Sequence, residues 1–385
     1  MTDSALRDLF HDAAPSLDGP GPAAIDRAWR DGTRRRVGAR VAVVGSVAAT
    51  VAVVTGVALV GGSDGRVAPD PSVDAPTSTP TPPVTGPPVA EQVGKYAGAD
   101  VWWAPSVTDE SSLPPLSVAQ LPPVVDLDAA QEEAVGEPVV GLFSGRGERA
   151  FALTASQRVI EIDTSRLETL TDEAGNRRNP LSSYSLSADR QSAFFIQKSS
   201  LEVLDFVTGE WTTIDTPDWL AEEARWMMPD QIWLPSRLGD DSGGTIHPVG
   251  PGVTTTATID WVRGWSGPDD QPWGPVVFGR GGTAQAAFAG LDLVSPTRFA
   301  APEVIFVDQR GERSVLAFDR GPGEEGTRVK GCCIPRAWID EDTVLFSSVS
   351  TEGQRILAWD VGTPTVHLVS DIRGPASLTA LADLS

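Results

Sequence analysis

The stretch Ser187–Glu210, SADRQSAFFIQKSSLEVLDFVTGE, decides the fold of this chain. An apolar run at 193–196 is followed by a polar loop, a second apolar run at 201–204, Asp205 and a Thr208-Gly209 turn. Short runs of aromatic and β-branched residues bounded by turn residues are typical of paired strands. The stretch therefore predicts one hairpin of a β-sheet.

The same unit, two apolar runs with the second ending in Asp, occurs at three further places. These are Phe151–Leu153 with Val159–Asp163, Val304–Phe306 with Val315–Asp319, and Val344–Phe346 with Ile356–Asp360. Asp205 follows Asp163 by 42 residues and Asp360 follows Asp319 by 41, the period of a four-stranded propeller blade. We therefore expect an all-β domain over 96–385, a β-propeller of about seven blades with six or eight also open. An array of β-sandwiches is the structural alternative.

The repeat resembles that of the TolB and WD40-like β-propellers, in which S-x-D-G-x-x-x-A-F opens a strand and D-x-x-T-G closes the next. The opening is matched by Ser187, Asp189, Ala193 and Phe194, and the close by Asp205, Thr208 and Gly209. Gln191 stands near the position where that repeat has a glycine. The resemblance covers four units and implies a propeller that binds its ligand through one face.

An uncharged segment precedes this domain. Residues 41–62 read VAVVGSVAATVAVVTGVALVGG, and a helix of that length rises about 33 Å, enough for a hydrocarbon core of about 30 Å. Five arginines lie before it: Arg30, Arg34, Arg35, Arg36 and Arg40. The positive-inside rule then predicts a transmembrane helix over 37–62, a cytoplasmic N-terminus and an extracytoplasmic domain beyond it. A cleaved signal sequence is the alternative, although no small-x-small cleavage site closes the segment.

Two short segments flank the predicted span. In the tail, residues 1–36, Leu6, Leu9, Phe10 and Ala13 have helical spacing before a Gly/Pro break, which predicts short amphipathic helices that lie on the membrane or on a partner. The linker, residues 63–95, is rich in Pro and Thr, a composition that predicts an extended stalk.

The tail resembles the N-terminal region of actinobacterial single-pass membrane proteins that accompany sigma factors, some of which are anti-sigma proteins. The matching features are the helix around DLFHDAA, the Gly/Pro break, the WRDGTRRR run and the Ala/Val-rich span. The resemblance implies a cytosolic sigma factor as a partner of residues 1–36. The zinc pattern of one class of these proteins is absent, because His11 has no cysteine near it.

The net charge excludes one class of partner. The chain carries a formal charge of −22, and residues 41–385 hold 23 basic and 46 acidic side chains. Such an acidic surface repels the phosphate backbone of nucleic acids, and we therefore expect no nucleic-acid binding. The acidic clusters at 240–241 and 340–342 lack the spacing of a calcium loop, and we expect no metal or other cofactor.

Two pairs of residues are candidate sites. Cys332 and Cys333 are the only cysteines and are adjacent, so in an oxidising compartment they predict a vicinal disulfide, a rigid turn with a redox switch or ligand platform as alternatives. Trp265 and Trp273 flank a Gly-Pro-Asp-Asp loop, which predicts exposed aromatic rings on a ligand face; blade packing is the alternative.

No nucleophile motif stands out. His247 and His367 are the only histidines beyond the predicted span, and no G-x-S-x-G elbow occurs. We therefore expect a non-enzymatic, membrane-anchored propeller that binds or senses a protein, peptide or glycan in the cell envelope. A transmembrane anti-sigma-like regulator is the second interpretation, and a secreted hydrolase on a propeller scaffold is the third.

Overall fold

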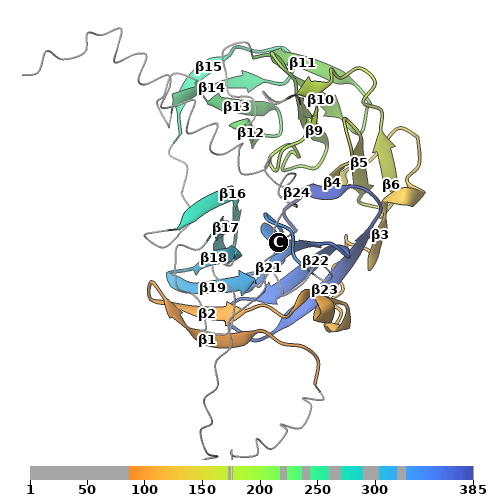
Figure 1. The fold of residues 1–385 in the computed structure, drawn as a ribbon. Helices are drawn as coiled ribbons and strands as arrows, with labels where there is room; N and C mark the ends of the chain where they lie inside the picture. The colour runs from red at the N-terminus through yellow and green to blue at the C-terminus, as the bar shows by residue number, and fades with distance from the viewer. Residues whose placement is uncertain are drawn as a thin grey trace, which may run out of the picture. The chain divides into compact units, whose positions relative to one another are not determined.

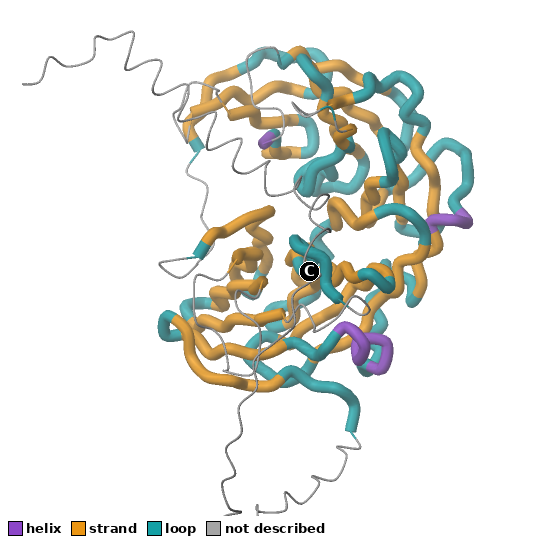
Figure 2. Tube along the Cα trace, viewed as in Figure 1, coloured by secondary structure: helices purple, strands orange, loops and turns teal. Residues whose placement is uncertain are grey.

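The computed structural model describes residues 86–171, 175, 177–216, 223–235, 243–259, 270–288, 303–318 and 327–384. These residues belong to one compact unit, Pro82–Ser385. Strands and loops make up nearly all of it, with short 3-10 helices such as η2, Val107–Ser112, and η3, Leu127–Ala129 (Figure 2). The predicted all-β class is therefore confirmed.

The described strands form five sheets of three or more strands, numbered here as blades in the order in which the chain builds them (Figure 1). Blade 1 has β24 (Ser377–Leu381), β4 (Val139–Ser144), β5 (Ala150–Thr154) and β6 (Val159–Ile162). Blade 2 has β9 (Ser192–Ile196), β10 (Ser200–Asp205) and β11 (Trp211–Asp215). Blade 3 has β12 (Arg225–Met228), β13 (Gln231–Pro235), β14 (Gly243–Pro248) and β15 (Thr255–Thr258).

The last two blades also recruit strands from the beginning of the unit. Blade 4 has β16 (Gln271–Gly279), β17 (Gly282–Phe288), β18 (Glu303–Gln309) and β19 (Glu312–Phe318), followed by β2 (Ala99–Trp103) and β1 (Glu91–Tyr96). Blade 5 has β20 (Ile334–Trp338), β21 (Thr343–Ser350), β22 (Gly353–Asp360), β23 (Val366–Arg373) and β3 (Val124–Asp126). A separate two-stranded sheet pairs β7 (Leu170–Thr171) with β8 (Arg177–Arg178).

Three non-local pairings tie the blades together. β2 joins β19 in parallel, and β3 joins β23 in parallel, so the segment before blade 1 lengthens blades 4 and 5 at their free edges. β24, near the C-terminus, pairs antiparallel with β4 and so completes the first blade with the end of the chain. β1 begins at Glu91, within the residues assigned to the linker from composition.

Neighbouring blades share hydrophobic cores because their strands are apolar on both faces. Phe194 and Phe195, adjacent in β9, are both fully buried and point to opposite faces. Phe195 packs with residues of blade 1 and Phe194 with residues of blade 3. Each such aromatic contributes about 2 to 3 kcal/mol by burial. Successive apolar residues in one strand therefore pack against the two neighbouring blades.

Blade 5 repeats this pattern between blades 4 and 1. In β21, Phe346 lies in a core with Leu316 of blade 4, and Leu345 lies in a core with Phe151 of blade 1. Shared cores thus connect the sheets in the order 4, 5, 1, 2, 3. This face-to-face stacking of small antiparallel sheets, closed in blade 1 by the terminal strand, is the β-propeller arrangement.

Two hairpins of blade 4 end in tight turns that need a left-handed backbone. Arg310 and Gly311 connect β18 to β19 with φ of 54° and 93°, and Ala97 and Gly98 connect β1 to β2 with φ of 49° and 87°. Positive φ at both central positions is the type I′ turn, which fits the twist of paired strands. Glycine adopts this backbone without a Cβ penalty.

The four repeat units found in the sequence are hairpins of four different blades: β5–β6, β9–β10, β18–β19 and β21–β22. The predicted number of about seven blades, with six or eight open, is corrected to five among the described residues. The prediction assumed an even spacing of the blades. The recruited strands β1, β2 and β3 and the segment between β3 and β4 use part of the length without forming blades of their own.

Candidate functional site

A cavity of about 170 Å³ lies where the edge strands of three blades meet. Its lining comes from β16 of blade 4, β20 of blade 5 and β24 of blade 1, together with Ser183 and Tyr184 in the loop before β9. We call it the central pocket. Edge strands leave one row of main-chain N–H and C=O groups without a partner strand, so the pocket is bordered by groups that can form hydrogen bonds.

The walls of the central pocket are mostly apolar. Val276, Phe278, Ala337 and Leu381 line it, and Phe278 is 44% exposed, an unusual degree for a phenylalanine in a strand. Exposed apolar side chains at a concave site are typical of ligand-binding surfaces.

Arg336 of β20 is the basic residue of this pocket. Its Nη1 donates to the main-chain O of Thr379 at 2.6 Å, its Nη2 to the main-chain O of Leu378 at 2.7 Å, and its Nε to Oγ of Ser347 at 3.2 Å. No carboxylate of the described residues forms an ion pair with it. Burial without a counter-charge lowers the pKa of Arg336 to about 9, so the guanidinium is still cationic at neutral pH.

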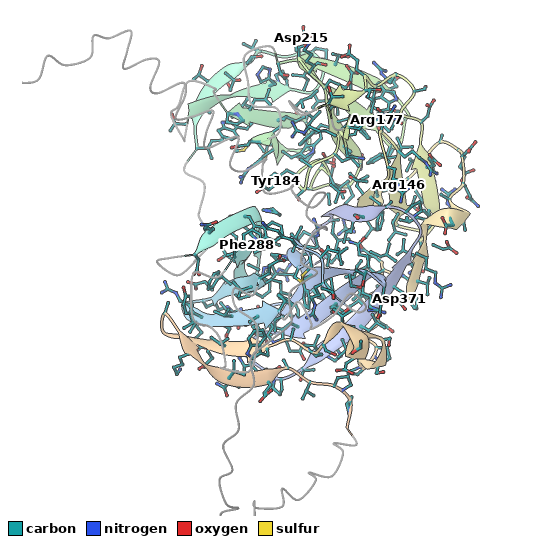
Figure 3. All side chains as sticks on the ribbon, in the orientation of Figure 1. Arg146, Arg177, Tyr184, Asp215, Phe288 and Asp371 are labelled. Carbon is teal, nitrogen blue, oxygen red and sulfur yellow. A yellow bond between two sulfur atoms is a disulfide. The ribbon has the colours of Figure 1, made fainter. Side chains whose placement is uncertain are left out.

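Tyr184, in the loop before β9, is another residue of the lining (Figure 3). The guanidinium of Arg225 sits over its ring at 4.2 Å from the centroid, and Nε1 of neighbouring Trp226 donates to the main-chain O of Ser185 at 2.8 Å. Burial raises the pKa of Tyr184, so its phenol is neutral at physiological pH. These contacts hold the loop against blade 3.

Asp383 is the acidic residue of the lining, and it is exposed. Its main-chain O accepts a hydrogen bond from Nη2 of Arg190 at 2.7 Å, which fixes the segment after β24. The pocket therefore combines a cation deep among edge strands with a carboxylate at a solvated position.

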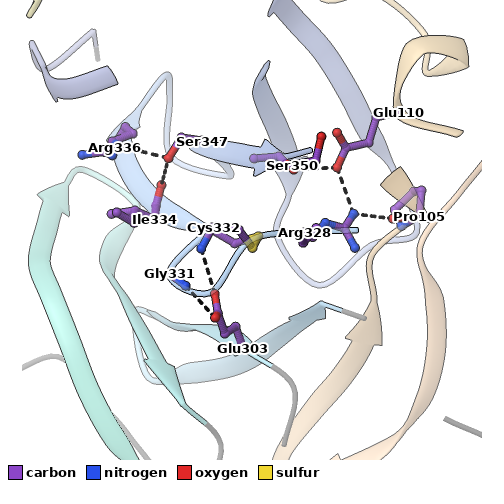
Figure 4. Close-up of a disulfide and its surroundings, with 12 residues drawn as sticks. Pro105, Glu110, Glu303, Arg328, Gly331, Cys332, Ile334, Arg336, Ser347 and Ser350 are labelled. Carbon is purple, nitrogen blue, oxygen red and sulfur yellow. Dashed lines mark hydrogen bonds and ion pairs between the residues drawn. A yellow bond between two sulfur atoms is a disulfide. The ribbon is translucent and has the colours of Figure 1, made fainter. Parts of the chain in front are cut away.

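Cys332 and Cys333 form a disulfide in the structure, in the loop that leads into β20 (Figure 4). Both residues are buried, and so is Glu303 of β18 beneath them. The two carboxylate oxygens of Glu303 accept the main-chain N–H groups of Gly331 at 2.6 Å and Cys332 at 2.9 Å. The carboxylate thereby fixes the turn that carries the disulfide.

Glu303, Cys332 and Cys333 also present a carboxylate oxygen and two sulfurs within 4.8 Å of one another, a spacing that suits a metal ion. Here the sulfurs are bonded to each other, and a disulfide sulfur is not the thiolate that binds metals. In this state the cluster is a structural element.

A buried ion network lies beside the disulfide loop, on the side away from Arg336 (Figure 4). Glu110 of η2 accepts hydrogen bonds from Nη2 of Arg328 at 2.9 Å, Nη1 of Arg355 at 3.1 Å and Oγ of Ser348 at 2.7 Å. Glu110 is 1% exposed and Arg328 2%. Two guanidinium groups and a hydroxyl thus compensate one carboxylate. The network anchors η2 to blade 5.

The structure places only part of the predicted site residues. Trp273 of β16 is half-buried and stacks on Phe288 at a centroid distance of 5.5 Å, with its ring beside Gly331 of the disulfide loop. Trp273 and the cysteines are therefore neighbours, which the sequence did not suggest. Trp265 lies outside the described residues, as does the acidic cluster at 240–241.

The other acidic cluster, at 340–342, forms a turn. Oδ1 of Asp340 accepts the main-chain N–H groups of Asp342 at 2.9 Å and Thr343 at 2.8 Å, just before β21. These two contacts give Asp340 a structural role in the turn.

The topology residues Arg30, Arg34, Arg35, Arg36 and Arg40 and the predicted span at 37–62 also lie outside the described residues. Within the part of the chain that the structure describes, no helix has the length and apolarity to cross a membrane.

The sequence patterns did not indicate Arg336, Phe278 or Glu110 as site residues. A signal for Arg336 was present, because it interrupts the otherwise apolar strand IPRAW at 334–338. No local signal marked Glu110, which occurs in the polar run VTDESS and meets its arginine partners only through the fold.

No family model matches the chain, and no curated protein matches it in sequence. Among solved structures, TolB from Acinetobacter baumannii is 10% identical, with 63% of this chain and 55% of that one covered at a TM-score of 0.29. The acylaminoacyl peptidase of Pyrococcus horikoshii is 11% identical, with 62% and 40% covered at 0.23. A chain from an analysis of two prolyl endopeptidases is 12% identical, with 61% and 35% covered at 0.21.

The chain thus spans little more than half, or less, of the length of these structures. The assignment of the fold to the β-propellers rests on the five sheets described above.

Proposed function

We propose that this protein is a non-catalytic propeller of the bacterial cell envelope that binds a protein, peptide or glycan ligand in the central pocket. The observation that carries the proposal is the meeting of three edge strands, β16, β20 and β24, around one apolar cavity. A peptide fits this cavity best, because an extended chain can form hydrogen bonds with edge strands while its side chains occupy apolar walls.

The positions of the histidines support a binding role over catalysis. His247 shares a hydrogen bond with Oγ1 of Thr245 at 2.7 Å in β14, and burial lowers its pKa. His367 in β23 pairs with Asp360 at 3.5 Å. In the described part of the chain neither lines the central pocket, so the pocket has no general base of this type.

A pocket-blocking variant tests the binding role in cross-linked cells that express the full chain. Ser183→Phe adds a ring at the lining, and Val253→Phe adds one at a position that is 83% exposed and outside the pocket. We expect recovery of an envelope partner, measured by quantitative mass spectrometry, to fall at least tenfold with Ser183→Phe and to stay unchanged with Val253→Phe. Equal recovery by both variants contradicts the proposal.

Membrane anchoring is the second part of the proposal, and the uncharged segment 41–62 behind five arginines supports it. Tags at the two ends of the chain test it by protease treatment of spheroplasts. We expect a protected N-terminal tag, an accessible C-terminal tag, and release from the membrane fraction when residues 37–62 are deleted. Accessibility of both tags contradicts the predicted topology.

The anti-sigma-like role of residues 1–36 is the second candidate function, and the tail's resemblance supports it. The N-terminal tag tests it directly. Retention of a sigma factor by the tail makes the protein a signalling regulator, whereas failure of residues 1–36 to retain one in pull-downs under mild detergent counts against this role.

A further inference from the structure

We propose that the central pocket binds a monoanionic carboxylate with an apolar substituent, such as the C-terminal residue of a peptide, and that the carboxylate pairs with Arg336. This rests on the proposed function of the pocket as the binding site, and it assigns the chemical class of the ligand. Three features of the pocket support this assignment: the free donors of Arg336, its missing counter-charge and the apolar walls beside it.

Arg336 has two donors left for a ligand. A guanidinium carries five N–H groups, and three are used by Ser347, Leu378 and Thr379. The two that remain are one on each terminal nitrogen, Nη1 and Nη2. A carboxylate accepts two parallel N–H groups from a guanidinium in a bidentate pair. The donors left on Arg336 therefore match this ligand group in number and type.

The protein holds Arg336 in place with carbonyls and a hydroxyl alone. Carbonyl oxygens accept its N–H groups but do not neutralise its charge, and a buried uncompensated cation costs free energy. An incoming carboxylate supplies the missing charge at a partly buried site, where an ion pair is stronger than at the fully exposed surface. The guanidinium is also fixed at three points, so little side-chain entropy is lost on binding.

The charge of the surroundings selects a monoanion. Residues 41–385 carry twice as many acidic as basic side chains, and Asp383 lines the pocket itself. A dianionic phosphate meets about twice the repulsion that a carboxylate meets from the same field. Val276, Phe278 and Leu381 then provide the apolar surface for the substituent next to the acid.

The test uses the purified full-length chain and three probes: N-acetyl-L-leucine, its uncharged amide N-acetyl-L-leucinamide, and inorganic phosphate. Affinities are measured by ligand-observed saturation-transfer NMR at low ionic strength, where charge effects are least screened. We expect the acid to bind at least tenfold more tightly than the amide, and more tightly than phosphate. This comparison needs no variant, so it does not depend on a mutant folding.

Two variants then locate the effect. Arg336→Gln should reduce the affinity for the acid to that for the amide, with circular dichroism and the unfolding midpoint as checks of the fold. Asp383→Asn should raise the affinity for the acid several-fold and leave the affinity for the amide unchanged, because the substitution removes a repelling carboxylate from the lining. Unchanged acid binding by a folded Arg336→Gln protein overturns the proposal.

The outcomes distinguish the carboxylate assignment from the proposed role of the pocket as a binding site. Equal binding of acid and amide overturns the carboxylate assignment and leaves the pocket as a binding site. Tighter binding of phosphate overturns the monoanion class. Binding of none of the probes also overturns the assignment, while the proposed function is judged independently by the Ser183→Phe cross-linking experiment.

Discussion

Arg328 and Arg336 lie on either side of the disulfide loop (Figure 4), and they differ in whether a carboxylate of the protein compensates their charge. Arg328 is 2% exposed and pairs with Glu110, a carboxylate brought from η2. Arg336 lines a cavity and meets main-chain carbonyls and a hydroxyl. The first charge is compensated inside the fold and serves stability. The second is left without a counter-ion at a place that a ligand can reach, and it serves binding.

The largest effect is expected on the compensated side. Glu110→Gln leaves Arg328 and Arg355 without their shared carboxylate, and removal of one partner from a buried pair costs about 3 to 5 kcal/mol. Urea unfolding should show this loss as a lower midpoint with an unchanged slope. The matched control is Glu341→Gln, whose exposed pair with Arg310 should leave the midpoint where it is. An equal shift for both variants contradicts a special role for the buried network.

The disulfide between the two arginines should be protected by burial. Cys332 and Cys333 are 2% and 0% exposed, so reductant has little access to their sulfurs in the folded protein. We expect no alkylation after native treatment with a soluble reductant, and two alkylated thiols after the same treatment in denaturant, as measured by intact mass.

Stability should depend only weakly on this bridge. The loop it closes is the shortest there is, so its effect on the unfolded chain is about 1 kcal/mol. A much larger loss in the double Cys332→Ser, Cys333→Ser variant would show that the disulfide organises the pocket and the ion network together.

Backbone strain in a turn of blade 4 should have a similar, local effect. Gly311 has φ of 93° in the β18–β19 turn, and a Cβ there meets no atom within 4 Å. Gly311→Ala should therefore lower the free energy of unfolding by about 1 kcal/mol through the backbone alone. Gly86→Ala is the control, because that glycine is equally open and has no positive φ. An unchanged midpoint for Gly311→Ala would contradict the type I′ turn.

The smallest effect on stability is expected at Arg336. Arg336→Met removes three hydrogen bonds but also relieves an uncompensated cation, so the free energy of unfolding should change by less than about 1 kcal/mol. Urea unfolding beside Glu110→Gln measures the contrast directly. A loss as large as that of Glu110→Gln would make Arg336 a structural residue and remove the distinction between the two arginines.

The binding of an acid should follow the charge of Arg336. Its pKa of about 9 in the free protein means that the guanidinium is cationic through neutral pH and loses charge as the pH rises past that value. Affinity for N-acetyl-L-leucine should therefore be constant between about pH 6 and 8 and decline above about 9, while affinity for the amide stays constant. A decline shared by both probes would point to a general loss of structure.

The sequence predicted the hairpins well because their signal is local. The apolar run at 344–346 is followed ten residues later by a second apolar run, which begins at Ile356 and ends at Asp360, and the structure pairs these runs as β21 and β22. The number of blades could not be predicted in the same way. β2, β3 and β24 pair with strands that lie far from them in the chain, and their own residues do not indicate which strand is the partner.

The candidate site shows the same limit. Two adjacent cysteines are visible in any reading of the sequence, and their disulfide needs no information about the fold. The role of Arg336, in contrast, depends on main-chain carbonyls 42 and 43 residues away, and the role of Glu110 depends on arginines 218 and 245 residues away. Whether a buried charge is compensated is decided by such distant partners, so composition and spacing could not distinguish the two arginines.

A crystal structure of the chain soaked with N-acetyl-L-leucine shows whether Arg336 holds a carboxylate ligand. We expect five blades closed by β24 and a carboxylate bound through both oxygens to Nη1 and Nη2 of Arg336, with the leucine side chain against Val276 and Leu381. Density for the acid elsewhere, with Arg336 paired to a carboxylate of the protein itself, would contradict it.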